Sequence, residues 1–213
     1  MSFGKIFRKL FIKTTDFTHG FQEKPRKSLL SFYKLWSLCY DFSVKLDPAY
    51  PREMKRMIDS VVKQGDVVLD IGCGTGLGTI HASKIAKKVI GIDLSPDMTD
   101  KLKKKIHHKK IENIEIIVGS FPESLPQEAK FDSVISSFTI VHFPIEQRGI
   151  IYEHIFNHIV SNGRIGLFSA QGEVGSTFET KPEIIKNLKS VGFQKLEIED
   201  VFDIYRIVRA DKP

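Results

Sequence analysis

One stretch of ten residues, VVLDIGCGTG at positions 67 to 76, constrains the fold of this chain more than any other feature. An apolar segment ends there at Asp70 and passes at once into a loop that contains Gly72, Gly74 and Gly76. Glycine adopts positive φ without strain and lets the backbone approach a ligand closely. The residues that follow favour a helix, whose first N–H groups are unpaired and face the same place. The stretch therefore predicts a strand, a ligand-binding loop and a helix.

From about residue 60 onward, short runs rich in Val and Ile alternate with helical patterns. This alternation is typical of an α/β fold with a doubly wound, Rossmann-like parallel sheet. We expect seven strands, at Val67–Ile71, Lys88–Asp93, Ile114–Val118, Ser133–Phe138, Arg164–Ala170, Lys195–Val201 and Ile204–Arg209. We expect helices at Leu77–Ile85, Pro96–His107, Glu146–Ile159 and Pro182–Val191. Ser95 can cap the second of these helices, and Gly192 closes the last.

Length and composition limit the classes of protein to consider. A chain of 213 residues can bury one α/β core plus an extension, and we expect a helical extension at 1–50 and a ligand-binding domain at 51–213. No apolar run approaches the roughly 20 residues that span a bilayer. Cys39 and Cys73 lack the spacing of a disulfide scaffold or a zinc site, so we expect a cytoplasmic protein without a bound metal.

The net charge of +6 permits a nucleic acid, an anionic membrane surface or an acidic substrate as a partner. The run 101–110 holds the densest positive charge, and its place late in a predicted helix favours a solvated face. Near the N-terminus, apolar residues recur at helical spacing among basic ones, at Phe3, Ile6, Phe7, Leu10 and Phe11. The predicted basic amphipathic helix either docks on the domain or lies on a membrane surface.

The glycine loop departs from the dinucleotide-binding fingerprint, because Leu77 stands where the third glycine of that fingerprint would fall. With Asp70 included, the DxGxGxG pattern resembles the class I S-adenosylmethionine (SAM)-dependent methyltransferases. Three later motifs follow in the order of that family: VIGIDLS at 89–95, IVGSFPESLP at 117–126 and FDSVISSFTIVHFP at 131–144. The last is similar to the ubiquinone/menaquinone-biosynthesis type of methyltransferase. The resemblance covers about residues 60 to 210.

The resemblance implies a mostly parallel sheet with an antiparallel last strand, and SAM as cofactor with S-adenosylhomocysteine (SAH) as product. It places Asp70 near the amino-acid end of the cofactor and gives the ribose hydroxyls to Asp93, whose carboxylate can accept both. The cofactor-binding residues it implies are Asp70, Gly72, Cys73, Gly74, Thr75, Gly76, Asp93, Leu94, Ser95, Met98, Gly119, Ser120, Phe121, Ser136, Ser137 and Tyr40. Tyr40 belongs to a Tyr-Asp element that folds over the cofactor in relatives, and family members often carry an acid where Ser120 stands.

The implied reaction is a direct displacement, in which a substrate nucleophile attacks the methyl carbon in line with the departing sulfur. His142 is the candidate general base, because histidine can take a proton near neutral pH. The basic amphipathic start and the aromatic segment 32–41 favour a small or lipid-like acceptor, with peripheral contact to the inner membrane surface.

Two alternatives stay open. RNA or protein methylation is motivated by the positive charge, although the segment after the fourth strand lacks the Asn/Asp-Pro-Pro-Tyr pattern common in enzymes that methylate amino groups of nucleic acids. A SAM-binding scaffold without turnover is motivated by the missing acid at Ser120.

Overall fold

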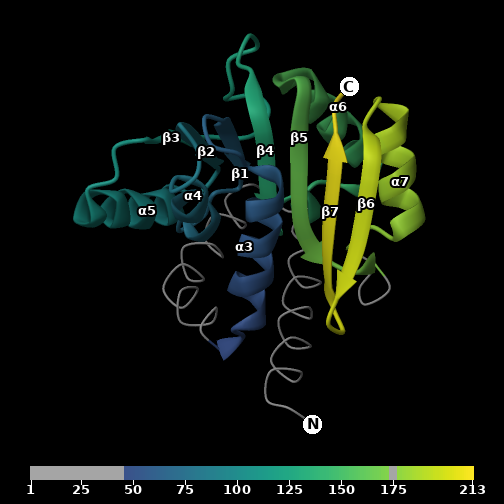
Figure 1. The fold of residues 1–213 in the computed structure, drawn as a ribbon, viewed down its shortest axis with the longest axis horizontal. Helices are drawn as coiled ribbons and strands as arrows, with labels where there is room; N and C mark the ends of the chain where they lie inside the picture. The colour runs from purple at the N-terminus through teal and green to yellow at the C-terminus, as the bar shows by residue number, and fades with distance from the viewer. Residues whose placement is uncertain (1–45, 173–176) are drawn as a thin grey trace.

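The computed structural model describes residues 46–172 and 177–213, which form a seven-stranded sheet with helices on both faces (Figure 1). The strands are β1 (Val67–Ile71), β2 (Lys88–Asp93), β3 (Ile114–Val118), β4 (Phe131–Ser137), β5 (Ile159–Ala170), β6 (Gln194–Val201) and β7 (Tyr205–Asp211). The helices are α3 (Ala49–Val61), α4 (Leu77–Ala82), α5 (Pro96–Lys109), α6 (Arg148–His158) and α7 (Lys181–Ser190), with short 3-10 helices at Ile140–His142 and Ile145–Gln147. The predicted amphipathic helix and Tyr40 lie outside the described residues.

The strand order in the sheet is β3-β2-β1-β4-β5-β7-β6. Strands β1 to β5 pair in parallel, and β7 lies antiparallel between β5 and β6. The expected mostly parallel sheet with an antiparallel last strand is thereby confirmed. The connections from β1 and from β4 lead to opposite sides of the sheet, and ligands of open α/β sheets bind at such a switch point, outside the carboxyl ends of the strands. In Figure 1 this is the lower edge of the sheet.

Local sequence signals explain most element boundaries. β1, β2 and β3 have the predicted bounds. Helix α5 begins as expected, with Pro96 in its first turn and the Ser95 side chain accepting a hydrogen bond from the Met98 N–H at 3.4 Å. Gly192 follows α7 with a φ of 107°, as a residue just past a helix often does.

Strand β5 and helix α4 differ from the predicted bounds. β5 begins at Ile159 rather than at Arg164. In the sequence, the apolar pattern is interrupted near Asn162, which has a φ of 61°, but in the structure the pairing with β4 continues across this point through a register shift. Helix α4 ends at Ala82 rather than at Ile85, and the chain turns through residues 83–87 before β2.

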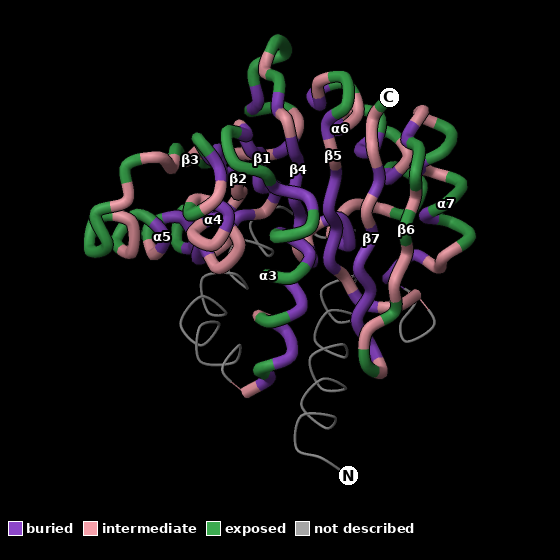
Figure 2. Tube along the Cα trace, viewed as in Figure 1, coloured by how far each residue is buried: buried purple, intermediate pink, exposed green. Residues whose placement is uncertain are grey.

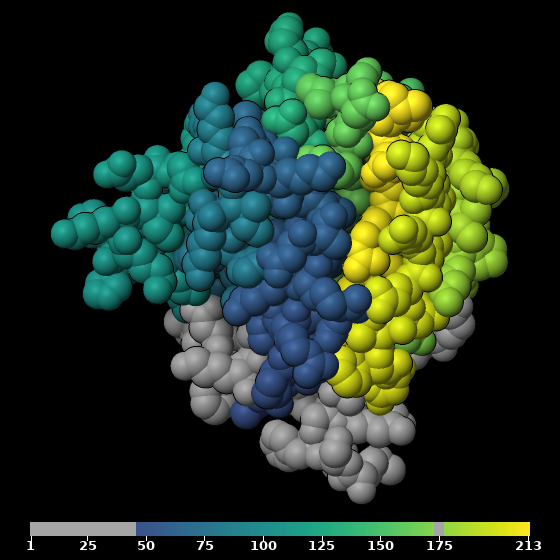
Figure 3. Space-filling view, in the orientation of Figure 1, coloured from purple at the N-terminus to yellow at the C-terminus, as the bar shows by residue number. Residues whose placement is uncertain are grey.

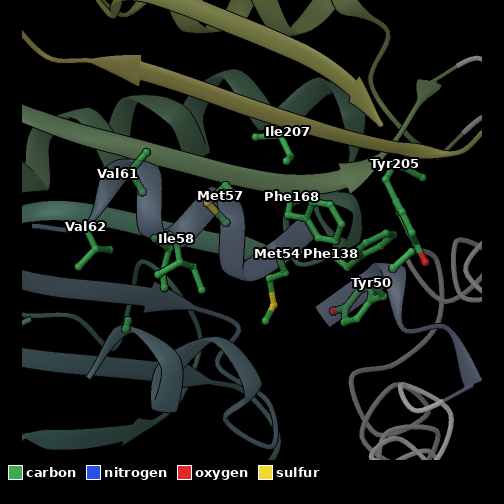
Figure 4. Packing of buried hydrophobic residues seen from close by; sticks show 14 of the residues in the cluster. Tyr50, Met54, Met57, Ile58, Val61, Val62, Phe138, Phe168, Tyr205 and Ile207 are labelled. Carbon is green, nitrogen blue, oxygen red and sulfur yellow. The ribbon is translucent and has the colours of Figure 1, made fainter. Parts of the chain in front are cut away.

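Helix α3 is an element that the sequence patterns did not predict. It begins at Ala49, two residues before the expected domain boundary at 51, and crosses the front of the sheet (Figures 1 and 3). Its buried side chains recur at helical spacing and pack on β4, β5 and β7 (Figure 4), at Tyr50, Met54, Met57, Ile58 and Val61. Gly166 of β5 makes this approach possible, because a Cβ atom there would lie 2.4 Å from the Met57 sulfur.

The core has two parts, one on each face of the sheet. One joins α3 and α4 to β1, β4, β5 and β7, and the other joins α6 and α7 to the opposite face. Figure 2 shows the buried residues concentrated in the central strands, while α5 projects from the body with an exposed outer face. Within the two described ranges, the structure contains no helix that is both long and apolar enough to cross a membrane.

Candidate active site

The glycine loop between β1 and α4 forms the centre of the candidate site. Gly72, Gly74 and Gly76 all have positive φ, at 75°, 53° and 89°. The N–H groups of Gly72 and Cys73 donate to the Ile92 carbonyl at 2.8 and 3.1 Å, which fixes the loop to the end of β2. The loop conformation therefore depends on glycine and on contact with the neighbouring strand.

The three glycines have different packing roles. A Cβ atom at Gly72 would lie 1.8 Å from Thr139 Oγ1, and one at Gly76 would lie 2.1 Å from Leu102 Cδ1. Among the described residues, the nearest atom to a Cβ at Gly74 would be the Gly72 carbonyl oxygen at 4.0 Å. Two glycines thus allow neighbouring elements to pack against the loop, while at Gly74 the described part of the chain leaves room for a ligand to approach the backbone.

Two carboxylates lie at the ends of β1 and β2, beneath this loop. Thr79 Oγ1 donates to Asp70 Oδ2 at 2.6 Å. Asp93 accepts from the Gly74 N–H at 2.8 Å and from the Ser95 N–H at 2.8 Å, one bond to each carboxylate oxygen. Each oxygen keeps a second lone pair, so Asp93 can hold the loop and still accept hydrogen bonds from a ligand.

The electrostatic environment of both acids favours a cationic ligand. Burial raises the pKa of Asp70 to about 7; the Thr79 hydrogen bond opposes this rise and the Asp93 charge adds to it. Burial also raises the pKa of Asp93, against the hydrogen bonds from the Ser95 and Gly74 N–H groups. A positive group placed beside these carboxylates would replace the hydration they lost on burial.

Residues after β2 and β3 complete this side of the site. The Gly119 N–H donates to the Asp93 carbonyl at 2.9 Å, so the end of β3 lies against the end of β2. Leu94 and Ser120 are half-buried at this edge. Phe121, by contrast, turns its ring into the core, where the centroids of the Phe121 and His158 rings lie 6.4 Å apart. A stacking role of Phe121 on a ligand stays a prediction that this placement does not favour.

Three predicted site residues support the loop from within the protein. The Cys73 side chain is buried against Gly91, where an added Cβ atom would lie 2.9 Å from the Cys73 Cβ, and burial raises the pKa of its thiol. Met98 is buried beneath the first turn of α5, which Ser95 caps. Cys73 therefore offers its backbone, rather than its thiol, to a ligand.

Hydroxyl groups and aromatic rings lie where β4 ends. Ser136 Oγ donates to the Ile71 carbonyl at 3.0 Å, and Ser137 Oγ shares a hydrogen bond of 3.1 Å with the Tyr50 hydroxyl. The rings of Tyr50, Phe138, Phe168 and Tyr205 meet with centroids 5.1 to 6.1 Å apart (Figure 4). This end of the site is therefore walled by apolar surface with a few hydroxyl groups.

His142 lies just beyond β4, in the 3-10 helix Ile140–His142. Burial lowers its pKa to about 4, and the Arg148 charge contributes to the lowering. The imidazole is therefore neutral at pH 7, so it can accept a hydrogen bond but holds an abstracted proton weakly. A base role for His142 stays a prediction.

Three residues that the sequence patterns did not indicate contact the site in the structure. Tyr50 reaches Ser137 from α3, Thr79 bonds Asp70 from α4, and Lys105 of α5 donates to the Thr75 carbonyl at 2.9 Å. The helical spacing of apolar residues in 50–61 was the signal for α3. Lys105 lies three residues after Leu102, on the buried side of α5.

The chain is similar to known methyltransferases. Residues 68–163 match the model of a methyltransferase domain family. The ribosomal protein L11 methyltransferase of Clostridium perfringens is 28% identical over 165 residues, which cover 73% of this chain and 49% of that protein. An uncharacterised methyltransferase of Alkaliphilus oremlandii is 27% identical over 190 residues, with 80% and 83% covered. The chain thus spans about half the length of the L11 methyltransferases that it matches.

A solved structure shares the fold over most of the chain. The DhpI–SAH complex superimposes with a TM-score of 0.73 at 20% identity, covering 88% of this chain and 97% of that one. At this level of identity the likeness establishes the fold, and the chemistry has to be argued from the residues of the site.

Proposed function

We propose that the protein is a SAM-dependent methyltransferase acting on a small or lipid-like acceptor. The proposal is supported by the match of residues 68–163 to the model of a methyltransferase domain and by the fold shared with the DhpI–SAH complex. The observation that carries this proposal is the bond between the Gly74 N–H and Asp93 Oδ2 at 2.8 Å. It joins the open glycine loop of β1 to the acid at the end of β2, so one ligand can contact both.

The residues present fit SAM. Gly74 leaves space for the cofactor to contact the backbone of the loop, and Asp93 has lone pairs for two ribose hydroxyls. Asp70 is a buried carboxylate whose raised pKa marks a place for a positive charge, and the methionine ammonium of SAM supplies one. The site needs no phosphate-binding cations, because SAM carries no phosphate.

Bound SAM supplies an activated methyl group on a positively charged sulfur. The chain's own contribution is placement and exclusion of water, which such displacements require more than acid–base chemistry. Ser137 and Tyr50 offer hydroxyl groups to orient an acceptor at the end of β4. Phe138 and Phe168, both buried, exclude water beside them. His142 can accept a hydrogen bond from an acceptor that must lose a proton.

The cofactor role is tested at Asp93. In Asp93→Asn, the affinity for SAH should fall by about tenfold or more in calorimetry, because a charge-assisted hydrogen bond contributes about 1.5–3 kcal/mol. Asp97→Asn is the matched control, since this exposed acid lies four residues away in the first turn of α5. An Asp93→Asn protein that folds and binds SAH as tightly as wild type would refute the proposed site.

The acceptor class is tested by a transfer screen with SAM labelled in its methyl group. The proposal expects label in quinol or phospholipid acceptors. Label in RNA or in a protein would instead support RNA or protein methylation and contradict a small or lipid-like acceptor. SAH binding without turnover on any of these classes would favour a SAM-binding scaffold.

We also propose that the protein acts in the cytoplasm, peripherally at the inner membrane surface. The support comes from the basic amphipathic pattern of residues 3–13, together with the net charge of +6. The full chain should sediment with anionic vesicles of phosphatidylglycerol and phosphatidylcholine, and a chain lacking residues 1–13 should not. Equal sedimentation of the two would remove the basis for this location.

A further inference from the structure

The lysine-rich run on α5 contains a side chain that turns toward the cofactor loop. Lys105 is half-buried, and its Nζ donates to the Thr75 carbonyl at 2.9 Å across 30 residues of sequence. It lies three residues after Leu102 and seven after Met98, so it belongs to the buried face of α5. Other lysines of the run are exposed, at Lys103, Lys104, Lys109 and Lys110.

The bond from Lys105 fixes one peptide group of the loop. The carbonyl of Thr75 and the N–H of Gly76 belong to the same planar unit and point in opposite directions. On the opposite side, the Gly76 N–H donates to the Cys73 carbonyl at 2.9 Å. With Lys105 on the carbonyl, both ends of this peptide are held, and Thr75 is 1% exposed.

Helix α5 and strand β2 thereby hold the loop from two directions. Leu102 of α5 packs directly on Gly76, where an added Cβ atom would be 2.1 Å away. Asp93 at the end of β2 holds the Gly74 N–H. Lys105 adds a charged donor to the α5 side, next to the turn into α4.

We propose that Lys105 is a positioning residue for the cofactor: it holds the Thr75 carbonyl and so keeps the 72–76 loop in the shape that binds SAM. The identity of the ligand rests on the proposed function. Without this bond the loop populates other backbone conformations, and the apparent affinity falls in proportion to the competent fraction. Lys105 acts through Thr75, so it is not a catalytic residue.

The first test compares SAH binding to the full-length protein and its variants by calorimetry. Lys105→Met, which keeps the length of the side chain but loses the donor, should bind SAH about tenfold more weakly. Lys105→Arg should recover most of the affinity, because guanidinium also donates to a carbonyl. Lys104→Met is the matched control on the exposed face and should bind like wild type. Wild-type affinity in Lys105→Met, or an equal loss in Lys104→Met, would overturn the proposal.

The second test separates positioning from general stability. In the absence of ligand, hydrogen exchange of the peptide spanning 68–82 should be faster in Lys105→Met than in wild type, while exchange in α7 stays the same. A merely structural role would lower the melting temperature and speed exchange throughout. If the wild-type protein binds no SAH, the proposed function fails. The role of Lys105 in holding the loop is then judged from hydrogen exchange alone, and unchanged exchange rates of the 68–82 peptide in Lys105→Met would overturn it.

Discussion

Asp70 shows how one buried residue can connect folding with ligand binding. Its carboxylate is 4% exposed at the end of β1, and burial raises its pKa to about 7. In an unfolded chain this pKa is about 3.9. Between about pH 4 and pH 7 the folded protein without ligand therefore keeps a proton that the unfolded chain has released. The free energy of unfolding of the ligand-free protein falls as pH rises through this window.

Ligand binding should depend on pH in the opposite direction. A ligand with an ammonium group favours ionised Asp70 and lowers its pKa, so SAH affinity should rise by about tenfold between pH 6 and pH 8. Calorimetry in buffers of different ionisation enthalpy should show proton release near pH 7. His142 does not contribute in this range, because its pKa is about 4.

Asp70→Asn provides the matched comparison for this pH effect. The amide cannot ionise, so the affinity of this variant should be weaker and nearly independent of pH between 6 and 8. At pH 8 the ligand-free variant should be more stable than wild type by up to about 4 kcal/mol, because the rise of the Asp70 pKa from about 3.9 to about 7 is about three units of about 1.4 kcal/mol each. The same tenfold pH dependence in Asp70→Asn would assign the titration to another group.

At the scale of elements, the strands were easier to predict than the helix that covers them. β1, β2 and β3 are short, continuous apolar runs between turn residues, and their predicted bounds agree with the structure. Helix α3 was missed although its buried residues recur at helical spacing among charged ones such as Arg52, Lys55 and Arg56, which is the pattern of an amphipathic helix. Its place depends on a long-range match with Gly166, which no local pattern records.

The contact between α3 and Gly166 can be tested with two glycine substitutions. Gly166→Ala should lower the free energy of unfolding by about 2 kcal/mol in urea, because the new Cβ atom would press on Met57 and Val61, 2.4 and 2.8 Å away. Gly149→Ala is the control within helix α6, where the nearest atom would be 3.9 Å away. It should stabilise by about 0.5–1 kcal/mol, because alanine favours a helix more than glycine does. Equal effects of the two substitutions would contradict the close packing of α3.

At the scale of the whole molecule, the sequence predicts where the site lies but not all of its contacts. Parallel strands end at one edge of the sheet, so Asp70 and Asp93 could be expected together from their strand positions alone. The Tyr50–Ser137 and Lys105–Thr75 contacts join residues 87 and 30 positions apart. They depend on how helices pack across the sheet, and a single sequence does not encode that in any local spacing.

A buried ionic network joins the elements beyond β4 and β5. Arg148 is 1% exposed and donates to the carbonyls of Phe143, Val141 and Thr177 at 3.0, 3.1 and 2.7 Å. Its guanidinium also lies 3.8 Å from Glu179, which accepts a hydrogen bond from the Tyr152 hydroxyl at 2.7 Å. The network connects the segment that carries His142 to the segment that precedes α7, so the placement of both segments depends on it.

Arg148→Met should therefore destabilise the whole domain. We expect a loss of about 3 kcal/mol in urea unfolding, because a buried carboxylate and several carbonyls lose their donor. In a Glu179→Gln background the same substitution should cost about 1 kcal/mol less, since no unpaired buried carboxylate then remains at position 179. Lys88→Met is the control: its ion pair with Glu115 lies at the surface, where such pairs contribute about 0–1 kcal/mol. SAH affinity of the folded Arg148→Met protein should match wild type, because the hydrogen bonds and the ion pair of Arg148 go to Phe143, Val141, Thr177 and Glu179 rather than to Asp70 or Asp93. Equal losses for Arg148→Met and Lys88→Met would show that the buried network does not hold the two segments together.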